Sequence, residues 1–535
     1  MRYAHEVGKV RAAEQALMAR LPEGTLMQRA AAGLAAVCAR LLVSRAAPRR
    51  SRVYGARVAL LVGSGDNGGD ALYAGARLAR RGAGVTAILA GSKVHAQGLA
   101  ALRRAGGLTL ALRGGEHGTD GAGEDALADA LDTLDGADLV IDGFVGIGVS
   151  GGLRDPYARL ASRTSEVPGL VVAVDVPSGV DASTGCVEGT AVQADVTVTF
   201  GTWKPGLLVD PGASYAGVGE LVDIGLGDHL SDPDVVAMGT GDLAAMLPRP
   251  KPESDKYRRG VVGVVAGGEQ FTGAASLTVG GAVAGGAGMV RLVSVADPVE
   301  VVRGRWPEVV TTVIEPGDGA GVLGAGRVQA WVVGPGLGTD DAAARVLEAV
   351  LSTEVPVLVD ADGITLLARH RGWLERRAAP TVLTPHAGEL TRLVGGQRGE
   401  VEARRLEHVR RAAEQLGVTV LLKGSTTVIA EPERPARVNP TGTPWLATAG
   451  SGDVLSGLGG ALLAGGMNAL DAASAAAYLH GLAARLTALP AASPAASSAA
   501  GVPISSSDVI EALPRAFGAV YGADTEVVSG ADAEE

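Results

Sequence analysis

The chain has 535 residues and a formal net charge of −11 at pH 7. It is long enough for two domains of roughly 200 to 300 residues, and its acidity argues against nucleic acid or an anionic membrane as the main partner. Glycine, with 79 residues, is about twice as frequent as usual, and aromatic residues make up only 3%. We therefore expect cores of Val, Leu and Ala, with many glycine turns between the elements.

The two cysteines, Cys38 and Cys186, offer neither a disulfide framework nor metal-ligand spacing. They are typical of small apolar side chains in a reducing compartment. We find no uncharged apolar run of about 18 residues and no apolar signal core near the start of the chain. The expectation is a cytoplasmic protein without a membrane span.

After a helical segment (1–45), the chain reads RVALLVGSGDNGGDALYAGARLARRGAGVTAIL. This pattern predicts a strand (58–62), a glycine loop, a helix (about 71–81) and a second strand (85–89). Such a βαβ crossover indicates a parallel sheet. The loop GSGDNGGD differs from the G-x-G-x-x-G dinucleotide motif by its acidic and amide side chains. Their oxygens suit a cation or sugar hydroxyls better than a bare pyrophosphate.

Three later strands of this half also end in polar residues. Asp142 follows one apolar run and precedes a glycine loop (146–152), Asp175 and Ser178 end the next run, and Lys204 ends a third. Taken singly, each is explained by a turn, since Asp, Asn and Ser favour turns. Taken together they favour one crevice, because ligands bind outside the carboxyl ends of parallel strands. Asp175 and Lys204 could then serve acid–base chemistry.

The domain limits follow from changes in pattern. The first sheet is predicted to end near residue 226, and the polar, proline-bearing segment 227–250 is predicted to be a linker. A second α/β pattern then occupies 251–522. The acidic tail, 523–535, is expected to be disordered.

In the second half, short apolar strands again end in polar residues. The candidate site residues are Gly334–Gly338, Asp360 with Asp362, His386 with Glu389, Lys423 with Gly424–Thr427, and Asp453. A structural histidine is the simpler interpretation of His386. The two aspartates suit either Mg²⁺ or a plain turn. Lys423 ends a strand that looks buried and precedes small donors suited to phosphate or ribose.

The stretch TAGSGDVLSGLGGALLAG (448–465) places a glycine loop before an apolar helix. The free N–H groups of the first helical turn form an anion hole, and Asp453 lies in that same turn. A carboxylate beside a phosphate repels it, unless the carboxylate takes part in chemistry or holds a metal ion. The alternative is a tight turn with a capping aspartate.

The motifs of the two halves, taken in order, resemble two known families. LMQRAAAG, GSGDNGGD, IDGFVGIGVSGG, VDVPSG and TFGTWKPG resemble the NAD(P)H-hydrate epimerase domain. TGAASL, GPGLG, DADGITLL, LTPHAGEL, LLKGSTTVIA and ATAGSGDVLSG resemble the ADP-dependent NAD(P)H-hydrate dehydratase domain. The resemblance covers nearly the whole chain apart from the linker and the tail. It implies an α/β protein of two domains, a Rossmann-like parallel α/β sandwich (1–226) and a ribokinase-like α/β domain (251–522).

The resemblance also implies an activity and its small molecules. The chain would epimerise the R and S hydrates of NADH and NADPH (NADHX and NADPHX). It would then dehydrate the S epimer with ADP. Potassium would serve the epimerase and Mg²⁺ the dehydratase, no nucleic acid or membrane would be involved, and a homo-oligomer is expected.

The same resemblance assigns residues to each half. In the epimerase half it implies K⁺ ligands at Asn67, Asp142 and Ser178, substrate contacts at Asp66, Asn67, Gly68, Gly69, Asp70, Gly146, Ile147, Gly148, Val149, Ser150, Gly151, Gly152 and Asp175, and acid–base roles for Asp175 and Lys204. In the dehydratase half it implies substrate contacts at Ala274, Gly338, His386 and Asp453, adenine-nucleotide contacts at Lys423, Gly424, Ser425, Thr426, Thr427 and Gly452, and catalysis by Asp453.

Two positions depart from the family patterns. Asp66 stands where the family has asparagine, which adds a negative charge near the proposed K⁺ site, and Thr365 replaces an asparagine in DADGITLL. A different function also fits the residues. A ribokinase-like kinase of vitamins or sugars, fused to a non-catalytic Rossmann-like binding module, would have the same second fold.

Overall fold

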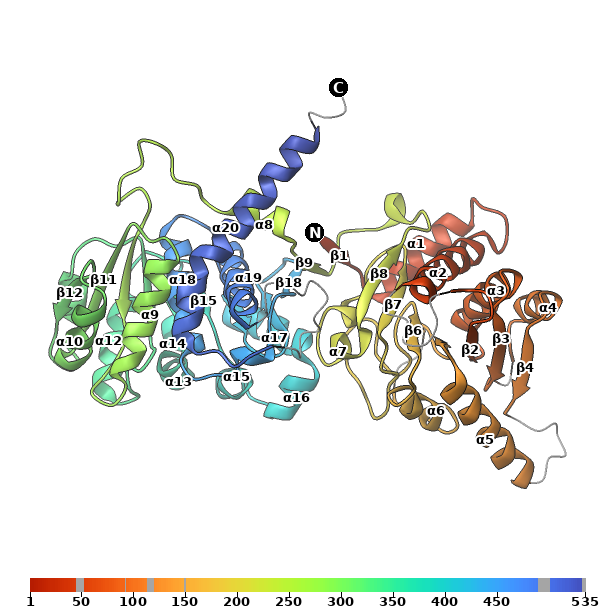
Figure 1. Ribbon diagram of the computed structural model, residues 1–535. Helices are drawn as coiled ribbons and strands as arrows, with labels where there is room; N and C mark the ends of the chain where they lie inside the picture. The colour runs from red at the N-terminus through yellow and green to blue at the C-terminus, as the bar shows by residue number, and fades with distance from the viewer. Residues whose placement is uncertain (45–51, 92, 113–119, 149–150, 489–500, 532–535) are drawn as a thin grey trace. The chain divides into compact units, whose positions relative to one another are not determined.

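The computed structural model describes residues 1–44, 52–91, 93–112, 120–148, 151–488 and 501–531. The chain forms two compact units, Tyr3–Val235 (the first unit) and Met1–Arg2 with Val236–Glu535 (the second unit). Each unit is built on one sheet with helices on both faces (Figure 1). This architecture confirms the predicted α/β class.

The sheet of the first unit has seven parallel strands in the order β4-β3-β2-β5-β6-β7-β8. The strands are β2 (Arg57–Val62), β3 (Gly84–Leu89), β4 (Leu108–Ala111), β5 (Leu139–Gly143), β6 (Leu170–Val174), β7 (Val196–Phe200) and β8 (Val218–Val222). The helices are α1 (Val7–Met18), α2 (Thr25–Val43), α3 (Asp66–Arg80), α4 (Ala96–Arg104), α5 (Asp120–Gly136), α6 (Tyr157–Thr164) and α7 (Gly212–Ala216), with short turns η1 (Pro205–Leu207) and η2 (Gly227–His229).

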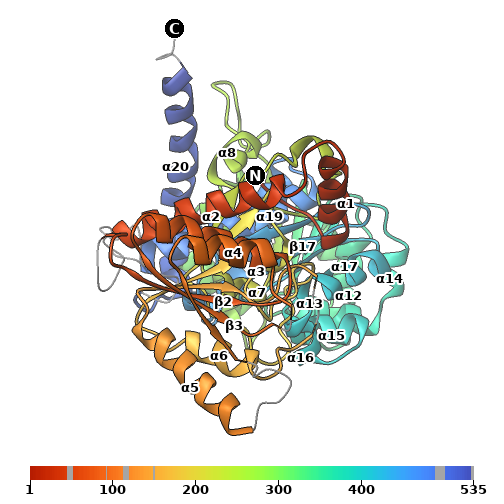
Figure 2. The same ribbon diagram turned by 90° about the vertical axis from the view of Figure 1, so that its right-hand side faces the viewer.

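Strand β2 shows how the two faces of this sheet are covered. Val58, Leu60 and Val62 pack with α2, α3 and α4, whereas Ala59 and Leu61 pack with α5 and α6 on the opposite face (Figure 2). Alternate side chains of a strand point to opposite faces, so a strand covered on both sides is apolar throughout. The strand order reverses between β2 and β5, which places the loops after these strands at a topological switch point.

Helix α3 begins at Asp66, five residues earlier than the predicted start at 71. Residues 66–70, predicted to be a loop, therefore form its first turns. Gly65 has the extended backbone of an N-cap, and an acidic first residue suits the positive end of the helix. Asn67 and Asp70 are also buried, and a buried backbone needs the internal hydrogen bonds that a helix supplies.

Helix α2 is the one helix in the described ranges that is long and apolar enough to cross a membrane by length and composition. Its buried side chains, such as Leu34 and Leu42, belong to the core of the first unit. Arg29 donates to the carbonyl oxygen of Ile224 (2.8 Å), and Arg40 pairs with Glu220 (2.6 Å). Packing in the core accounts for its apolar composition.

The sheet of the second unit has the order β1-β9-β18-β17-β16-β15-β14-β13-β10-β11-β12. Neighbours from β16 through β12 are parallel, while β17 is antiparallel to both β16 and β18. The strands are β1 (Arg2–Ala4), β9 (Val235–Ala237), β10 (Val261–Val265), β11 (Met289–Ser294), β12 (Val310–Val313), β13 (Ala330–Val333), β14 (Val357–Val359), β15 (Thr381–Leu383), β16 (Thr419–Leu422), β17 (Thr427–Ala430) and β18 (Ala436–Asn439).

The helices of this unit cover both faces of its sheet. They are α8 (Thr240–Met246), α9 (Thr272–Ala284), α10 (Ala296–Arg305), α11 (Gly319–Gly324), α12 (Asp341–Leu351), α13 (Asp362–Arg369), α14 (Gly372–Glu375), α15 (Ala387–Val394), α16 (Arg398–Ala403), α17 (Arg405–Leu416), α18 (Ser451–Ala464), α19 (Ala469–Ala488) and α20 (Ser506–Ala531), with the turn η3 (Pro444–Leu446). The short apolar strands expected in this half form as β10, β13, β14, β15 and β16. Their polar ends lie at the carboxyl edge of the sheet, as expected.

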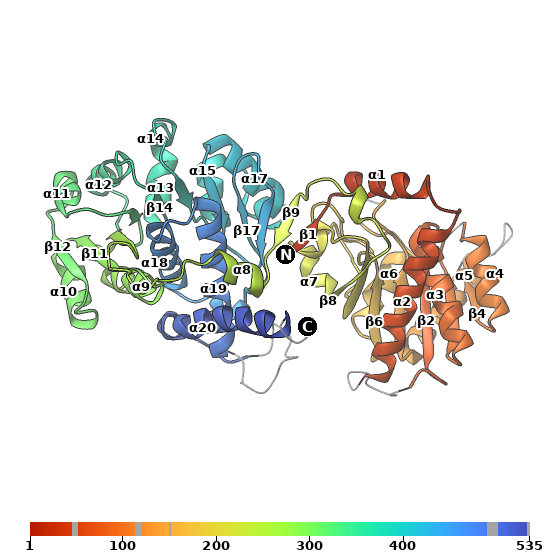
Figure 3. The same ribbon diagram turned by 90° about the horizontal axis from the view of Figure 1, so that it is seen from above.

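Helices α9 and α18 pack so closely that glycine is required between them. A Cβ at Gly457 would lie 1.9 Å from the carbonyl oxygen of Thr278, and one at Gly281 would lie 2.2 Å from that of Val454. Both helices contribute to the core on one face of β10, together with α8 and α20, which pack against each other (Figure 3). This close packing fixes the start of α18, where Asp453 lies.

Two boundary predictions differ from the structure. The segment 227–250, predicted to be a linker, contains β9 and α8, and its side chains Met238, Leu243 and Leu247 are buried in the core of the second unit. The sequence pattern did not predict these two elements, because three apolar positions among polar and proline residues are too few to show a period. Helix α20 also continues to Ala531, through most of the predicted disordered tail, because an established helix propagates at low cost. Residues 532–535 lie outside the described part.

Candidate functional site

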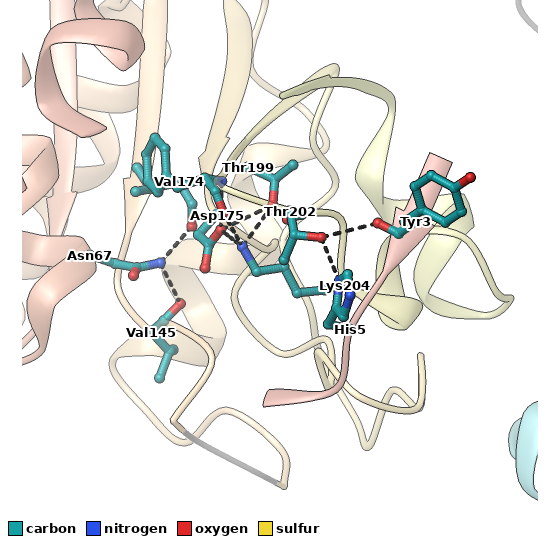
Figure 4. A network of polar contacts seen from close by, with 10 residues as sticks. Tyr3, His5, Asn67, Val145, Val174, Asp175, Thr199, Thr202 and Lys204 are labelled. Carbon is teal, nitrogen blue, oxygen red and sulfur yellow. Dashed lines mark hydrogen bonds and ion pairs between the residues drawn. The ribbon is translucent and has the colours of Figure 1, made fainter. Parts of the chain in front are cut away.

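In the first unit, a buried lysine and a buried aspartate form an ion pair at the carboxyl edge of the sheet. The ammonium of Lys204, only 1% exposed, donates to Asp175 Oδ1, to Thr199 Oγ1 (3.1 Å) and to the carbonyl oxygen of Phe200 (3.0 Å; Figure 4). Asp175 Oδ1 also accepts from Thr199 Oγ1 (3.0 Å) and from the N–H of Phe200 (3.1 Å). Asp175 has a positive φ of 66°, which is uncommon outside glycine and is often found at functional sites.

Of the three residues predicted to act together, Asp142 and Ser178 are in direct contact, and Asn67 is linked to Ser178 through hydrogen bonds to the backbone of Val145. Asp142 is fully buried and accepts from Ser178 Oγ (2.7 Å) and from the Ser178 N–H (2.8 Å). Asn67 Nδ2 donates to the carbonyl oxygens of Val174 (2.5 Å) and Val145 (3.4 Å). A Cβ at Gly146 would lie 2.3 Å from Asn67 Oδ1, so the glycine loop after β5 closes directly over this amide.

Further carboxyl groups crowd the same site. Burial, followed by the charges of Asp175 and Asp66, raises the pKa of Asp70 well above its ordinary value, and Asp70 Oδ1 is buried without a hydrogen-bond partner among the described residues. Burial and then the charge of Asp175 also raise the pKa of Glu14 on α1. Burial raises the pKa of Asp142 to about 6, against the opposing hydrogen bonds from Ser178. The site thus favours a bound cation or protonated carboxyl groups.

The remaining predicted residues of this half occupy varied positions. Gly68 and Gly69 are buried in the first turns of α3, and Ile147 packs against the core. Gly148 approaches the Arg11 side chain of α1, and Gly152 approaches the carbonyl oxygen of Glu188. Gly151 adopts a positive φ of 94°. Val149 and Ser150 lie outside the described residues.

In the second unit, Asp453 lies in the first turn of α18, as predicted. The N–H groups of Asp453 and Val454 donate to the carbonyl oxygen of Gly450 (3.1 and 3.2 Å). Because these two N–H groups already have partners, an anion bound at this turn would be centred on Gly452. Burial, and next the charge of Asp360, raises the pKa of Asp453 to about 7. A carboxylate with this pKa is well suited to general-base chemistry near neutral pH.

Lys423 and Asp360 form an ion pair beside that turn. Lys423 Nζ donates to Asp360 Oδ1 (2.6 Å), and Ser456 Oγ on α18 donates to Asp360 Oδ2 (2.7 Å). Burial alone would lower the pKa of Lys423, but the charges of Asp360 and Glu389 outweigh it and raise the pKa. A Cβ at Gly452 would lie 3.3 Å from Lys423 Nζ, so this glycine keeps the lysine close to the anion hole.

The other predicted residues surround these two groups. His386 caps α15: its Nδ1 accepts from the N–H of Glu389 (3.2 Å), and Glu389 Oε2 accepts from the N–H of His386 (2.8 Å). Burial, and then the charge of Lys423, lower the pKa of His386. Asp362 begins α13 and accepts from the N–H of Gly338 (3.0 Å). Both aspartates of the 360–362 pair thus accept hydrogen bonds within the protein, Asp360 from Lys423 and Ser456 and Asp362 from Gly338.

The loop after β16 turns into β17, so Lys423–Thr427 forms the tip of a hairpin. Thr426 is buried and Ser425 is exposed. Arg405, a buried residue of α17, donates to the carbonyl oxygens of Lys423 (3.3 Å) and Thr426 (3.5 Å). A Cβ at Gly424 would lie 2.1 Å from the Arg405 guanidinium. This arginine therefore holds the hairpin tip in place through its backbone carbonyl groups.

Sequence reasoning missed three residues of these sites: Glu14, Arg405 and His480. His480 on α19 is hydrogen-bonded to the backbone of Ser451, and burial lowers its pKa to about 4. The signal available for Arg405 and His480 was a charged or polar residue at an apolar helix position. That signal does not say which loop the side chain meets.

Comparison with known proteins gives matches for both halves. A family described as NAD(P)H-hydrate dehydratase matches residues 262–500, and one described as YjeF-related protein N-terminus matches residues 23–206. Two similar relatives are both described as "Bifunctional NAD(P)H-hydrate repair enzyme Nnr". The relative from Mycobacterium tuberculosis is 48% identical over 476 residues, which cover 89% of this chain and 92% of that protein. The relative from Mycobacterium leprae is 46% identical, covering 97% and 100%.

A solved structure from Bacillus subtilis also resembles part of the chain. It is an ADP/ATP-dependent NAD(P)H-hydrate dehydratase co-crystallized with ATP/Mg2+. It is 27% identical, covers 53% of this chain and 97% of that chain, and has a TM-score of 0.46.

Proposed function

The chain belongs to the family of bifunctional NAD(P)H-hydrate repair enzymes, and we propose that its two units carry out the two repair reactions in separate sites. The first unit interconverts the R and S hydrates. The second unit dehydrates the S hydrate with ADP. The family match supports repair over the alternative of a vitamin or sugar kinase with a binding module.

The dehydration begins at Asp453. Its carboxylate takes the proton of the C6 hydroxyl while the hydroxyl oxygen attacks the β-phosphorus of ADP, and AMP leaves. Donors at the Gly452 turn, with Lys423 beside them, stabilise the charge on the transferring phosphoryl group. The ring nitrogen lone pair then expels phosphate from C6, and loss of a C5 proton restores the dihydropyridine. Atoms balance as hydrate plus ADP giving NAD(P)H, AMP and phosphate.

The nucleotide and substrate contacts follow this geometry. Lys423–Thr427 and Gly452 contact ADP, whereas Ala274, Gly338 and His386 contact the hydrated nucleotide. Within the described ranges no group of three His, Cys, Asp or Glu side chains converges on a metal position. Magnesium would therefore enter with the phosphates and their water, as Mg²⁺ commonly does.

The epimerisation is assigned to Asp175 and Lys204. Their buried ion pair can move a proton between two side chains without contact with bulk water. The substrate would lie against Asp66–Asp70 and the 146–152 loop, next to Glu14 and Arg11. The crowded carboxyl groups would repel the substrate phosphates and weaken their binding unless a cation is present.

Potassium fits the residues proposed to hold it. An amide oxygen, a carboxylate and a hydroxyl from Asn67, Asp142 and Ser178 form an all-oxygen set, the type that hard cations prefer. Asp142 is fully buried, its hydrogen-bond partners among the described residues are Ser178 and Phe144, and burial raises its pKa to about 6. The ion would neutralise this charge and help to anchor the substrate phosphates.

The observation that carries the proposal is the position of Asp453, at pKa about 7, in a helix-start anion hole beside Lys423. The test supplies (S)-NADHX with ADP, or with ATP, and follows recovery of the reduced-nicotinamide absorbance. We expect recovery together with AMP and phosphate by HPLC when ADP is supplied. Accumulation of a stable phosphorylated compound without recovery would indicate a kinase instead.

A further inference from the structure

A cavity of about 410 Å³ opens at the carboxyl edge of the sheet in the second unit. It is separate from the hairpin tip Lys423–Thr427 that is proposed to contact ADP (the ADP hairpin). The segments after β10, β11, β12 and β13 line it, in particular Gly267–Phe271, Ile314–Gly317 and Gly336–Asp340. Its volume is within the range of small-molecule sites. The ends of parallel strands are also where such ligands bind.

The order of strands places this cavity across the reaction centre from ADP. Lys423 and the ADP hairpin follow β16, whereas the cavity lies at β13, β10, β11 and β12. Asp360, which faces Lys423 and Gly452, follows β14 between the two. A substrate at Asp453 therefore has ADP on one side and the cavity on the other.

The cavity wall adjoins residues that influence the reaction centre. Gly338 lines the cavity, and its N–H donates to Asp362, whose charge in turn raises the pKa of Asp453. Gly336 lines the cavity as well, and a Cβ on it would lie 2.9 Å from the side chain of Ala274. Two residues proposed to contact the substrate thus border the cavity.

We infer that this cavity binds the adenosine half of the hydrated dinucleotide. The inference rests on the proposed dehydration at Asp453. The reacting ring occupies only one end of the substrate, and the rest needs a place that ADP does not fill. Phe271 lines the cavity and is 57% exposed, so it offers an aromatic face on which the adenine base stacks.

The charge of the lining sets a preference between the two natural hydrates. Among the described residues that line the cavity, Glu269, Glu315 and Asp340 are acidic and none is Lys or Arg. These three acids outnumber the two arginines that adjoin the lining, Arg345 beside Gly317 and Arg369, which donates to the carbonyl oxygen of Thr339 (2.9 Å). Carboxylates accept hydrogen bonds from a ribose 2′-hydroxyl, whereas a 2′-phosphate requires a cationic partner. The dehydratase unit should therefore prefer (S)-NADHX to (S)-NADPHX.

The first test compares kcat/KM for the two S hydrates in the full-length enzyme. We expect a preference for NADHX of about tenfold, as one unfavourable charge contact would produce. Replacing two acids together, Glu269→Gln with Glu315→Gln, should raise kcat/KM for NADPHX and lower it for NADHX, since an amide is a weaker acceptor for the 2′-hydroxyl, so that the ratio falls toward one. Glu300→Gln, at an exposed glutamate of α10 outside the cavity lining, is the matched control and should leave the ratio unchanged.

The second test uses a truncated substrate, the S hydrate of reduced nicotinamide mononucleotide, which lacks the adenosine half. Phe271→Ala should raise KM for NADHX about tenfold, the loss expected for one stacked base, and leave turnover of the truncated hydrate unchanged. Tyr257→Ala removes a similarly exposed aromatic (54%) outside the cavity lining and should change neither substrate.

The outcomes separate this inference from the proposed function. Equal kcat/KM for NADHX and NADPHX, or an equal effect of Phe271→Ala on the full and truncated hydrates, would overturn the adenosine assignment while leaving dehydration intact. A failure to dehydrate either full-length hydrate would instead refute the proposed function, and the adenosine assignment with it.

Discussion

Asp453 is the residue on which the proposed dehydration depends. Its carboxylate lies in the turn that also holds the anion hole, so that proton removal and phosphoryl transfer occur at one place. Asp453→Asn keeps the shape and removes the base, which commonly costs 10²- to 10⁴-fold in rate. We expect that loss in turnover, with ADP affinity by calorimetry largely retained. Normal turnover in the variant would end the base assignment.

The pH dependence of dehydration should report the same carboxylate. Only ionised Asp453 accepts a proton, so kcat/KM should rise with pH, reach half its plateau near pH 7, and be lost as pH falls below that. The negative charge of Asp360 contributes to this raised pKa, so Asp360→Asn should move the half-maximal point to lower pH. If the pH of half-maximal kcat/KM stayed the same or rose in that variant, the electrostatic account would be contradicted.

Single residues at strand ends were predictable, whereas their supports were not. Asp175, Lys204, Lys423 and Asp453 each interrupt or end an apolar pattern, and the structure places each of them at a carboxyl strand edge or a helix start. Arg405 begins α17, the helix just before β16, and its side chain reaches the loop after that strand, 18 residues further along the chain. A contact over that separation leaves no local period or spacing, so only the packed structure identifies it.

At the scale of elements, the hairpin tip after β16 depends on a buried guanidinium. Arg405→Ala removes donors to the carbonyl oxygens of Lys423 and Thr426, and Gly424→Ala places a Cβ against the same guanidinium. Each change should raise KM for ADP about tenfold, the scale of a lost charged hydrogen bond, with KM for the hydrate nearly unchanged. Steady-state kinetics in both substrates measures this.

The neighbouring exposed arginine provides the control for that experiment. Arg404→Ala should leave both KM values near those of the wild type, and circular dichroism should confirm that all variants are folded. A rise in KM for the hydrate alone would show that the hairpin does not hold ADP.

Most element types were predicted correctly, apart from β9, α8 and the end of α20, and the start of α3 is a boundary with functional meaning. Both sheets and their crossover helices follow from apolar runs and glycine breaks. The start of α3 did not follow from the sequence pattern, because GSGDNGGD has the composition of a loop. Its buried position nevertheless requires helical hydrogen bonds. The proposed substrate contacts at 66–70 are therefore presented from a rigid helix start.

At the scale of the whole molecule, the second unit begins earlier than the sequence suggests. The segment that contains β9 and α8 buries Met238, Leu243 and Leu247 in its core. A fragment of residues 236–535 should therefore melt at a higher temperature than one of 251–535, because each buried leucine contributes on the order of 1.5–3 kcal/mol. Both fragments should dehydrate (S)-NADHX. Equal melting temperatures in calorimetry would show that this segment is only a linker.

The central claim is that one site interconverts the two epimers and an independent second site dehydrates the S epimer. A racemic hydrate mixture tests this claim most directly. Sites that lie in separate cores and share no partners should not couple. With ADP present, recovery of the reduced-nicotinamide absorbance should be one fast phase in the wild type. In Asp175→Asn it should split into a fast S phase and a slow R phase, and removal of K⁺ should give the same trace. A single fast phase in Asp175→Asn would contradict the account.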